Sequence, residues 1–109
     1  MDLIAFEFRV NDAVATITLN QGERGNPIDE AFCREIKTIA NYCDDNAVRA
    51  VLIEARGKNF SVGGDLKLFT QDRDGLPALT KKMTADLNAG VIRLARLEAP
   101  IVIALHGLV

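Results

Sequence analysis

The sequence has no long apolar run, no cluster of basic residues and no leader-like start. Its longest uninterrupted apolar stretch near the end, residues 100–105, is far shorter than the ~20 residues that cross a bilayer. Lys and Arg are scattered along a chain of net charge −2, which argues against nucleic acid as the main partner. Residues 1–10 lack both the basic start of a secretory signal and the Arg/Ser bias of a transit peptide. We therefore expect a cytoplasmic protein that neither spans a membrane nor binds nucleic acid.

Cysteine is scarce as well, with only Cys33 and Cys43 in the chain. The two lie ten residues apart on what the pattern predicts to be one helix, so they occupy different turns and cannot form a disulfide with each other. Neither has a second cysteine or a histidine at a spacing typical of metal ligands. We expect two reduced thiols in or near the core, and no metal site.

What is present is enough for one small domain. The 109 residues are 49% hydrophobic, within the range of ordinary globular proteins. A domain of this size still exposes much of its surface. Apolar segments that do not close on one another would therefore need further chain or partner subunits to cover them.

Alternation of apolar and polar residues predicts two antiparallel strands at the start. Residues 2–10 alternate loosely and residues 13–19 alternate well, with Asn11-Asp12 between them. Two such runs with a short polar turn are typical of a β-hairpin.

A polar loop, residues 20–25, leads into the first predicted helix, for which Asn26 is the expected N-cap and Pro27 the first helical residue. Five apolar residues recur along it at spacings of four, four, three and four, which places them on one face. They are Ile28, Phe32, Ile36, Ile39 and Cys43. Glu35 and the other charged residues of this helix are predicted to point away from the core.

The rest of the chain predicts a strand, a second long helix and a final strand. Residues 48–55 contain too few polar side chains for a half-exposed strand, so we expect a central strand covered on both faces. The second helix has Pro77 near its start and ends before Pro100. Its predicted apolar face consists of Leu79, Met83, Leu87, Val91 and Leu94. Residues 101–109 predict a continuous apolar strand, and the whole order predicts an α/β fold.

The most informative segment is Phe60–Leu66, which contains Gly63, Gly64 and Asp65 after the predicted central strand. A strand that ends in a tight glycine turn and continues into a helix leaves backbone N–H groups pointing outward, where they can hold an oxyanion or a carbonyl oxygen. The plainer interpretation is a strand-to-helix turn with Asp65 as an N-cap. Spacing alone does not decide between the two.

Five segments, in order, resemble the signature blocks of the crotonase superfamily, the enoyl-CoA hydratase/isomerase proteins. They are ATITLN at 15–20, NPID at 26–29, DNAVRAVLI at 45–53, FSVGGDL at 60–66 and APIVIALHG at 99–107. A single short glycine motif is weak support for a family, whereas five blocks in order are strong support. The resemblance implies a crotonase-like spiral of ββα units, with residues 1–109 as the N-terminal part of a single domain.

The same resemblance implies an enzyme that polarises an acyl-CoA thioester through two backbone N–H groups and stabilises the resulting enolate. It implies hydration of a trans-2-enoyl-CoA or a shift of its double bond, with coenzyme A as part of the substrate and no separate cofactor. It also implies assembly as a homotrimer or hexamer. The motif assigns the first oxyanion donor to the N–H of Gly64, while Gly63 permits the backbone conformation of the turn. The implied acyl-CoA-binding residues are Arg24, Pro27, Val62, Gly64, Asp65, Leu66 and Lys67.

The family's second oxyanion donor and its acidic catalytic residues belong to a region after the last predicted strand, and the sequence ends at Val109. We therefore expect an N-terminal fragment, truncated before the second oxyanion-hole glycine cluster and inactive by itself. Two alternatives remain open. The chain could be a CoA-binding or oligomer-forming module without turnover, or its parent could catalyse another crotonase reaction, such as dehalogenation, thioester hydrolysis or ring formation.

Other polar residues favour plain interpretations. His106 is the only histidine, and at the end of a buried strand a structural hydrogen bond is favoured over general-base catalysis. Arg56 and Lys58 precede the glycine segment and could meet CoA phosphates, although a solvated loop is favoured. Four scattered glutamates form no acid–base pair: Glu30, Glu35, Glu54 and Glu98.

Overall fold

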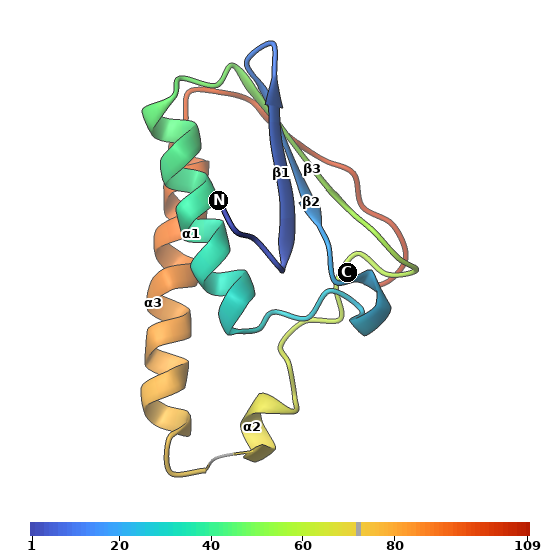
Figure 1. Ribbon diagram of the computed structural model, residues 1–109, viewed down its shortest axis with the longest axis vertical. Coiled ribbons are helices and arrows are strands. Elements are labelled where there is room, and N and C mark those ends of the chain that lie inside the picture. Colours follow the sequence, from blue (N-terminus) through green and yellow to red (C-terminus); the bar gives the residue numbers. More distant parts are fainter. Residues whose placement is uncertain (72) are drawn as a thin grey trace.

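The structure is a computed structural model that describes residues 1–71 and 73–109. Its strands are β1 (Phe6–Asn11), β2 (Val14–Leu19), β3 (Ala50–Ala55) and β4 (Ile101–Ile103). Its helices are the 3-10 helix η1 (Gly22–Arg24) and the α-helices α1 (Glu30–Asp45), α2 (Leu68–Gln71) and α3 (Leu76–Ala95). Helices α1 and α3 run side by side next to the sheet, and α2 lies beside the N-terminal end of α3 (Figure 1).

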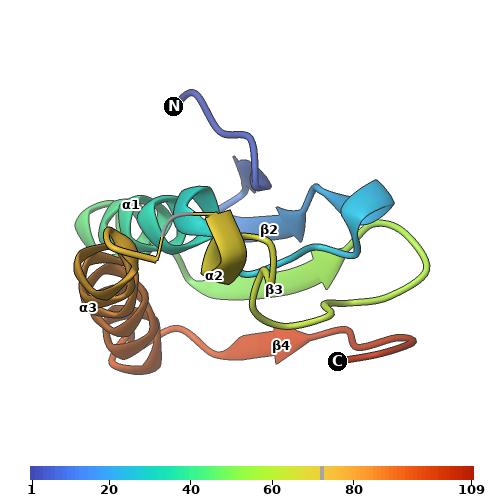
Figure 2. The same ribbon diagram turned by 90° about the horizontal axis from the view of Figure 1, so that it is seen from below.

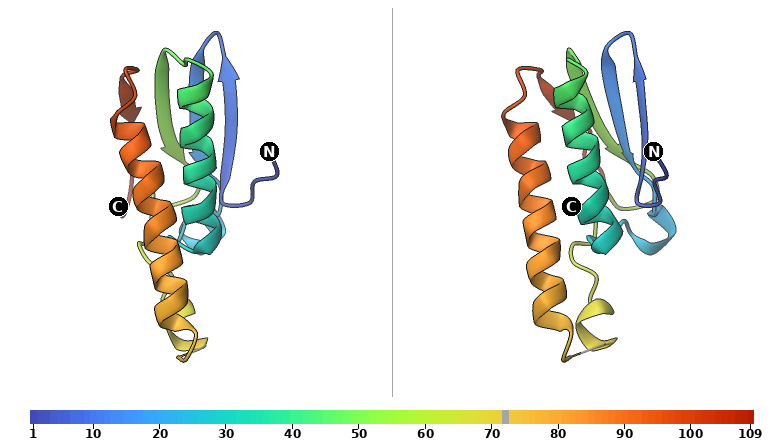
Figure 3. Two further views of the ribbon diagram at one scale, coloured as in Figure 1. Left: turned by 90° about the vertical axis from the view of Figure 1, so that its left-hand side faces the viewer. Right: turned by 60° about the vertical axis from the view of Figure 1, so that its left-hand side comes forward.

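The four strands form one sheet in the order β1-β2-β3-β4. The first pair is antiparallel, and the pairs β2–β3 and β3–β4 are parallel. Both long helices lie on the same side of this sheet, so the molecule has two layers (Figures 2 and 3). The α/β prediction is confirmed. No helix in the described part of the chain combines the length and apolar character needed to cross a membrane.

The core fills the space between the sheet and the two helices. Ala15 and Val51 are paired in the register of β2 and β3, and both are buried there. Elsewhere in β3 every residue keeps partial exposure, and Leu52 pairs with exposed Val102 of β4. The prediction that this strand is covered on both faces is therefore wrong, because both helices cover the same face.

The hairpin is present with a shifted turn. Its two central residues are Asp12 and Ala13, with φ of 51° and 64°, rather than Asn11 and Asp12. Two successive residues in the left-handed region are typical of the turns that match the twist of antiparallel strands. The first strand also begins later than predicted, at Phe6, because the preceding residues bind a side chain of α1.

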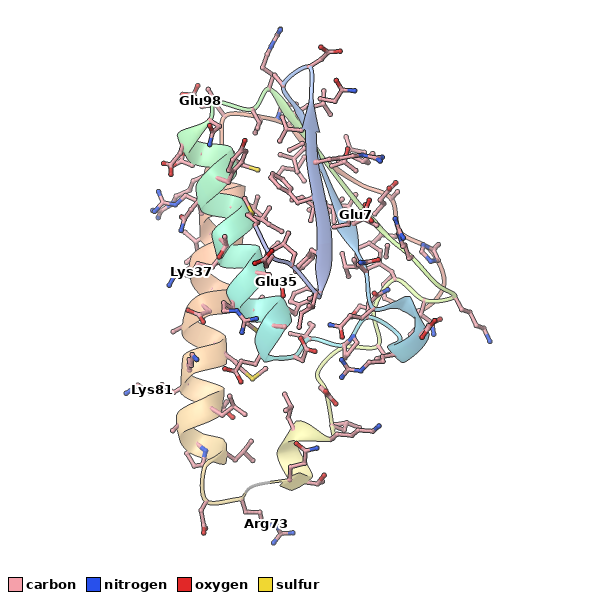
Figure 4. All side chains as sticks on the ribbon, in the orientation of Figure 1. Glu7, Glu35, Lys37, Arg73, Lys81 and Glu98 are labelled. Carbon is pink, nitrogen blue, oxygen red and sulfur yellow. The ribbon has the colours of Figure 1, made fainter. Side chains whose placement is uncertain are left out.

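That side chain is Glu35, which lies between α1 and β1 with only 2% of its surface exposed (Figure 4). Its Oε1 accepts hydrogen bonds from the backbone N–H groups of Ile4 (3.0 Å), Ala5 (2.9 Å) and Phe6 (3.3 Å). The prediction that Glu35 points into solvent is wrong. A carboxylate on the sheet-facing side of the helix supplies the acceptor that the N-terminal arm would otherwise lack.

Helix α1 begins three residues later than predicted. Its N-cap is Asp29, whose Oδ1 accepts from the Phe32 N–H at 2.8 Å. Asn26 and Pro27 lie before the helix, so their predicted roles as N-cap and first helical residue are wrong. The predicted apolar face is otherwise present: Ile36, Ile39 and Cys43 are buried, and Phe32 packs on Phe6 with ring centroids 4.7 Å apart.

Helix α3 packs on α1 through a glycine. A Cβ built on Gly90 would lie 2.9 Å from the backbone nitrogen of Lys37 and 3.0 Å from the carbonyl carbon of Ile36. Leu94, one turn further along, is buried against the same core, whereas Val91 is 51% exposed. The predicted apolar face of this helix is therefore correct at Leu94 and wrong at Val91, because the close approach at Gly90 sets which side faces α1.

The final strand is shorter than predicted and ends at Ile103. Residues 104–109 instead run beside the segment that follows β3. The N–H of Phe60 donates to the oxygen of His106 at 3.0 Å, and the N–H of Ser61 donates to that of Leu108 at 3.1 Å. These bonds replace sheet pairing and brace the glycine segment from one side.

We predict that Glu35→Ala lowers the free energy of unfolding by about 3 kcal/mol, because it leaves buried N–H groups of the N-terminal arm without an acceptor. Urea denaturation followed by circular dichroism measures the change. Glu98→Ala, at an exposed glutamate for which the described residues provide no hydrogen bond, is the control and is expected to change stability by less than about 0.5 kcal/mol. Equal losses in both variants would contradict the role of Glu35.

We also predict that Gly90→Ala destabilises the fold by about 2 kcal/mol, because a methyl group would meet the backbone of α1. Helix propensity alone predicts the opposite sign, a gain of about 1 kcal/mol. Asn88→Ala, at an exposed position of the same helix, is the matched control and is expected to be neutral or stabilising. A Gly90→Ala protein that melts above the wild type would show that the two helices do not approach as described.

Candidate functional site

The glycine segment is an extended loop, not a tight turn between a strand and a helix. Four residues separate the end of β3 at Ala55 from Phe60, and the next helix, α2, begins only at Leu68. The prediction of a direct strand-to-helix turn is wrong in this respect. One part of it holds, because Gly63 has φ of +89°, in the region that favours glycine.

The loop is held by backbone pairing with the segment before α1. The N–H of Val62 donates to the oxygen of Gly25 at 2.9 Å. On the other side of the glycine pair, Ile28 donates to the oxygen of Gly63 at 2.8 Å and accepts from the N–H of Asp65 at 3.3 Å. Ile28 and Gly64 thus form an isolated bridge of the parallel type.

Between Phe60 and Asp65, this pairing leaves one amide without a described partner, that of Gly64. In an extended segment successive N–H groups alternate in direction, so the groups on either side of Gly64 bond to Ile28 while its own N–H is directed elsewhere. The N–H of Gly63 donates to Ser61 Oγ at 3.1 Å. The N–H of Gly64 has no acceptor among the described residues.

A cavity of about 760 Å³ lies at this amide, a size typical of sites for small ligands. It brings together all seven residues that the sequence comparison with the crotonase pattern singled out. They are Arg24, Pro27, Val62, Gly64, Asp65, Leu66 and Lys67. Glu23 also lines the cavity and was not predicted. Nothing in the sequence distinguishes it from the other charged loop residues, because it enters the wall only through the fold of η1.

Two exposed apolar side chains line the cavity. Leu66 is 76% exposed, the highest value among the large apolar residues whose side chains the structure describes, and Val62 is exposed as well. Exposed apolar side chains beside a concave surface are typical of ligand contact. These two side chains therefore offer a surface for an apolar chain.

Asn26 fixes the loop that carries Arg24 and Pro27, a role that the sequence analysis missed by assigning it as an N-cap. The residue is buried, with φ of 51°. Its Oδ1 accepts from the N–H of Gln21 at 2.8 Å, and its Nδ2 donates to the oxygen of Arg56 at 2.8 Å. An Asn-Pro pair is also typical of turns, which is the one sequence signal that pointed to this alternative.

The charged groups of the cavity are largely paired with one another. Arg24 forms ion pairs with Asp65 (2.8 Å) and with Asp29 (3.2 Å), the N-cap of α1. Two cationic side chains line the cavity, Arg24 and Lys67. Unlike Arg24, Lys67 forms no ion pair with any of the described residues. The Lys67 ammonium group is therefore available to pair with an anionic ligand.

The remaining candidates lie outside the cavity wall. His106 Nε2 is 2.8 Å from the oxygen of Gly57, which is the structural hydrogen bond expected for this histidine. Arg56 pairs with Glu7 at 2.6 Å, on the side of β1 away from Glu35 (Figure 4). Lys58 is exposed. In residues 1–71 and 73–109, no three His, Cys, Asp or Glu side chains are placed to hold a metal ion.

Both cysteines are free and buried. Burial raises the pKa of Cys33 to about 11, with smaller contributions from the negative charges of Asp29, Asp86 and Glu30. Burial likewise raises the pKa of Cys43 to about 11. A thiol of this kind is a poor nucleophile near neutral pH. The two cysteines are therefore part of the core and not of a catalytic site.

We predict that both thiols react slowly with Ellman's reagent at pH 8 in the folded protein and rapidly after denaturation in urea. With a pKa of about 11, only about one thiol in a thousand is ionised at this pH. Because the folded state raises these pKa values above their unfolded values, the stability present below pH ~9 falls as pH rises towards about 11. Rapid labelling of the native protein at pH 8 would contradict the burial of these side chains.

Two proteins of known sequence that resemble this chain are named as isomerases of acyl thioesters. The trans-2-decenoyl-[acyl-carrier-protein] isomerase of Streptococcus mutans is 37% identical over 112 residues, covering 100% of this chain and 42% of that protein. The 1,2-epoxyphenylacetyl-CoA isomerase of Escherichia coli is 32% identical over 100 residues, covering 90% of this chain and 38% of that protein. This chain thus spans about two fifths of the length of these relatives.

Solved structures that resemble this chain include enoyl-CoA hydratases. An enoyl-CoA hydratase of Mycobacterium smegmatis matches 95% of this chain and 40% of its own, with a TM-score of 0.81 and 27% identity. An enoyl-CoA hydratase/isomerase of Mycobacterium paratuberculosis matches 98% of this chain and 43% of its own, with a TM-score of 0.80 and 28% identity. The sequence model of the enoyl-CoA hydratase/isomerase family matches residues 9–109. The chain therefore belongs to the enoyl-CoA hydratase/isomerase family, and its fold is the N-terminal part of the crotonase fold.

Proposed function

We propose that the cavity at Gly64 is one half of an acyl-CoA site in a crotonase-type enzyme, and that the Gly64 N–H is one of two oxyanion donors. The observation that carries the proposal is this unpaired amide: the amides of residues 60–63 and of Asp65 are all bonded, and Gly64 lines a ligand-sized cavity. A rigidly held donor needs no reorganisation when charge develops on a carbonyl oxygen, which is the basis of oxyanion stabilisation.

In this proposal the thioester oxygen of a trans-2-enoyl-CoA accepts from the Gly64 N–H. Polarisation of the carbonyl draws electron density from the conjugated double bond, so that water can add at C3 and a proton at C2. The same polarisation acidifies a carbon next to the carbonyl and so permits a shift of the double bond. Both reactions pass through an enolate, whose negative oxygen the same donor stabilises.

The proposal takes residues 1–109 as the N-terminal part of one crotonase-like domain. The second donor and the general acid and base then come from further chain. Asp65, a carboxylate of the cavity wall, is engaged by Arg24 and by the N–H of Lys67 at 3.1 Å, which makes it unsuited to proton transfer. We propose a cytoplasmic enzyme that works as a homotrimer or hexamer and needs no cofactor besides the coenzyme A of its substrate.

The wall of the cavity suggests how the carrier arm of the substrate binds. Lys67 offers a cation for a CoA phosphate, and the exposed side chains of Val62 and Leu66 offer apolar contact for the pantetheine arm or the acyl chain. Pro27 also lines the cavity. The contacts proposed for Lys67, Val62 and Leu66 use side chains that are exposed in this structure and, for Lys67, form no ion pair with the described residues.

A second candidate is isomerisation of a thioester carried by acyl-carrier protein. The observation that favours it is the 37% identity, over the whole chain, with a protein named for this reaction. The pantetheine arm and the thioester are common to both carriers. Parallel assays with acyl-CoA, acyl-pantetheine and acyl-carrier-protein thioesters of the same acyl group separate the two.

We predict that Gly64→Pro in the complete enzyme lowers kcat on crotonyl-CoA by about 10²–10³-fold, because proline has no N–H to donate. Gly64→Ala is the matched control: it retains the N–H, and the φ of Gly64 is not among the positive values of this chain. The kcat of Gly64→Ala is expected to stay within about tenfold of the wild-type value, because this variant keeps the donor that Gly64→Pro loses. Circular dichroism and urea denaturation establish that both variants fold.

Undiminished turnover in a folded Gly64→Pro protein would exclude the assigned donor. If the wild-type complete enzyme binds butyryl-CoA but turns over no unsaturated thioester, the chain is instead part of a CoA-binding module without catalysis. Loss of crotonyl-CoA turnover in both variants to the same extent would point to steric exclusion of substrate, and would also contradict the assignment.

A further inference from the structure

Arg24 joins three segments that are separate in the sequence. It ends η1, and its guanidinium contacts Asp29 at the start of α1 and Asp65 in the glycine loop. The two carboxylates bind different nitrogens, Nη1 for Asp29 at 3.2 Å and Nη2 for Asp65 at 2.8 Å. A planar guanidinium with fixed donor directions is suited to hold two such groups in one relative orientation.

Each of the two carboxylates is itself fixed at both oxygens. Asp29 uses Oδ1 to cap the Phe32 N–H and Oδ2 to bind Arg24. Asp65 uses Oδ1 to accept from the Lys67 N–H and Oδ2 to bind Arg24. The guanidinium therefore couples the first turn of α1, through Asp29, to the glycine loop, through Asp65.

Burial makes this coupling stronger than an ordinary surface ion pair. The side chain of Asp65 is 12% exposed, and that of Asp29 is similarly shielded, although Arg24 itself is 48% exposed. Shielded carboxylates are less screened by water and salt than exposed ones. Without Arg24, two shielded negative charges would face one vacated position. The glycine loop would then lose its side-chain tie to α1 and keep only its backbone bonds to Ile28.

The charge of the cluster argues against a direct role in phosphate binding. One guanidinium faces two carboxylates, and Glu23 lies in the same wall, so a phosphate approaching Arg24 would meet net negative charge. Lys67 has no such partner among the described residues. The phosphate contact is thus better placed at Lys67 than at Arg24, which changes the role that the family resemblance implied for Arg24.

We propose that Arg24 is a positioning residue that holds the Gly64 N–H in place through Asp65 and does not bind the phosphates of the substrate. Asp65 follows Gly64 directly, and its N–H bonds to Ile28 on the far side of the loop. Asp65 is therefore held from two directions, by its backbone and by its carboxylate, and the amide plane of Gly64 is set between this anchor and that of Gly63. The inference rests on the proposed function of the site.

The first test compares kcat with KM for crotonyl-CoA in the complete enzyme. Arg24→Gln is expected to lower kcat by about tenfold to hundredfold with KM changed less than about threefold, because small displacements of a catalytic group have effects of this size on the chemical step. Lys67→Gln is expected to show the reverse, a raised KM at nearly constant kcat. Arg49→Gln, at an exposed arginine that does not line this cavity, is the control and is expected to match the wild type.

Two further variants separate positioning from simple charge. Arg24→Lys keeps the charge but cannot span both carboxylates in one plane, so it is expected to recover only part of the kcat. The double variant Arg24→Gln/Asp65→Asn is expected to lose no more kcat than the worse single variant, because both changes break the same connection. Full recovery by lysine, or additive losses in the double variant, would overturn the proposal.

A measurement without substrate completes the test. In the 109-residue chain labelled with ¹⁵N, Arg24→Gln is expected to accelerate hydrogen exchange at the N–H groups of Ile28 and Asp65 by at least about tenfold, while amides of β2 stay unchanged. Unchanged exchange at both groups would overturn the proposal. If the chain does not yield a resolved spectrum, the same exchange is read by mass spectrometry on peptides of the complete enzyme.

The failure of this inference is distinguishable from the failure of the proposed function. A raised KM with unchanged kcat in Arg24→Gln, alongside a large loss of kcat in Gly64→Pro, would assign Arg24 to substrate binding and leave Gly64 as the donor. Full activity in Gly64→Pro would reject the proposed function whatever Arg24 does. Loss of kcat in both variants, with accelerated exchange at Ile28 and Asp65, is the result that supports both.

Discussion

The site depends on one backbone pairing, that of residues 25–28 with residues 62–65. Neither segment belongs to a helix or to the main sheet, so each would be a mobile loop if left alone. Together they satisfy several of each other's amides and carbonyls. The buried side chain of Asn26 attaches them to Gln21, the residue before η1, and to the loop after β3. The short parallel bridge thereby gives two irregular segments the rigidity of a sheet.

The free amide of Gly64 is a geometric consequence of that pairing. A bridge of the parallel type uses the groups on either side of its central residue, and it leaves that residue's own N–H on the opposite side. The donor is therefore unpaired because its neighbours are paired. This differs from the expectation of a helix N-terminus, in which several amides share one direction. A donor held at one fixed position selects the position of one atom of a ligand, whereas a helix terminus attracts negative charge over a wider region.

Apolar periodicity is local, so the sequence was sufficient for the order of the main strands and the two long helices. The residues that gather at the cavity were named through the resemblance to the crotonase signature blocks, not through periodicity. The sequence was insufficient wherever a side chain acts over a long distance in sequence. Glu35 was assigned to solvent because a carboxylate on a helix usually lies there, and its three backbone donors come from about thirty residues earlier. Asn26 was assigned as an N-cap since its partners Arg56 and Asn59 follow much later in the chain. Val91 was placed in the core because periodicity cannot register the close approach at Gly90.

The order of the strands across the sheet is the same as their order along the chain. Each strand after the first therefore finds its neighbour already synthesised, and no strand has to be inserted between two earlier ones. Such a chain can assemble from its first hairpin outward as it leaves the ribosome, adding one strand and its covering helix at a time. Strand β1 forms one edge of the sheet at every stage, and each later strand is added at the other edge, where the preceding strand offers a template.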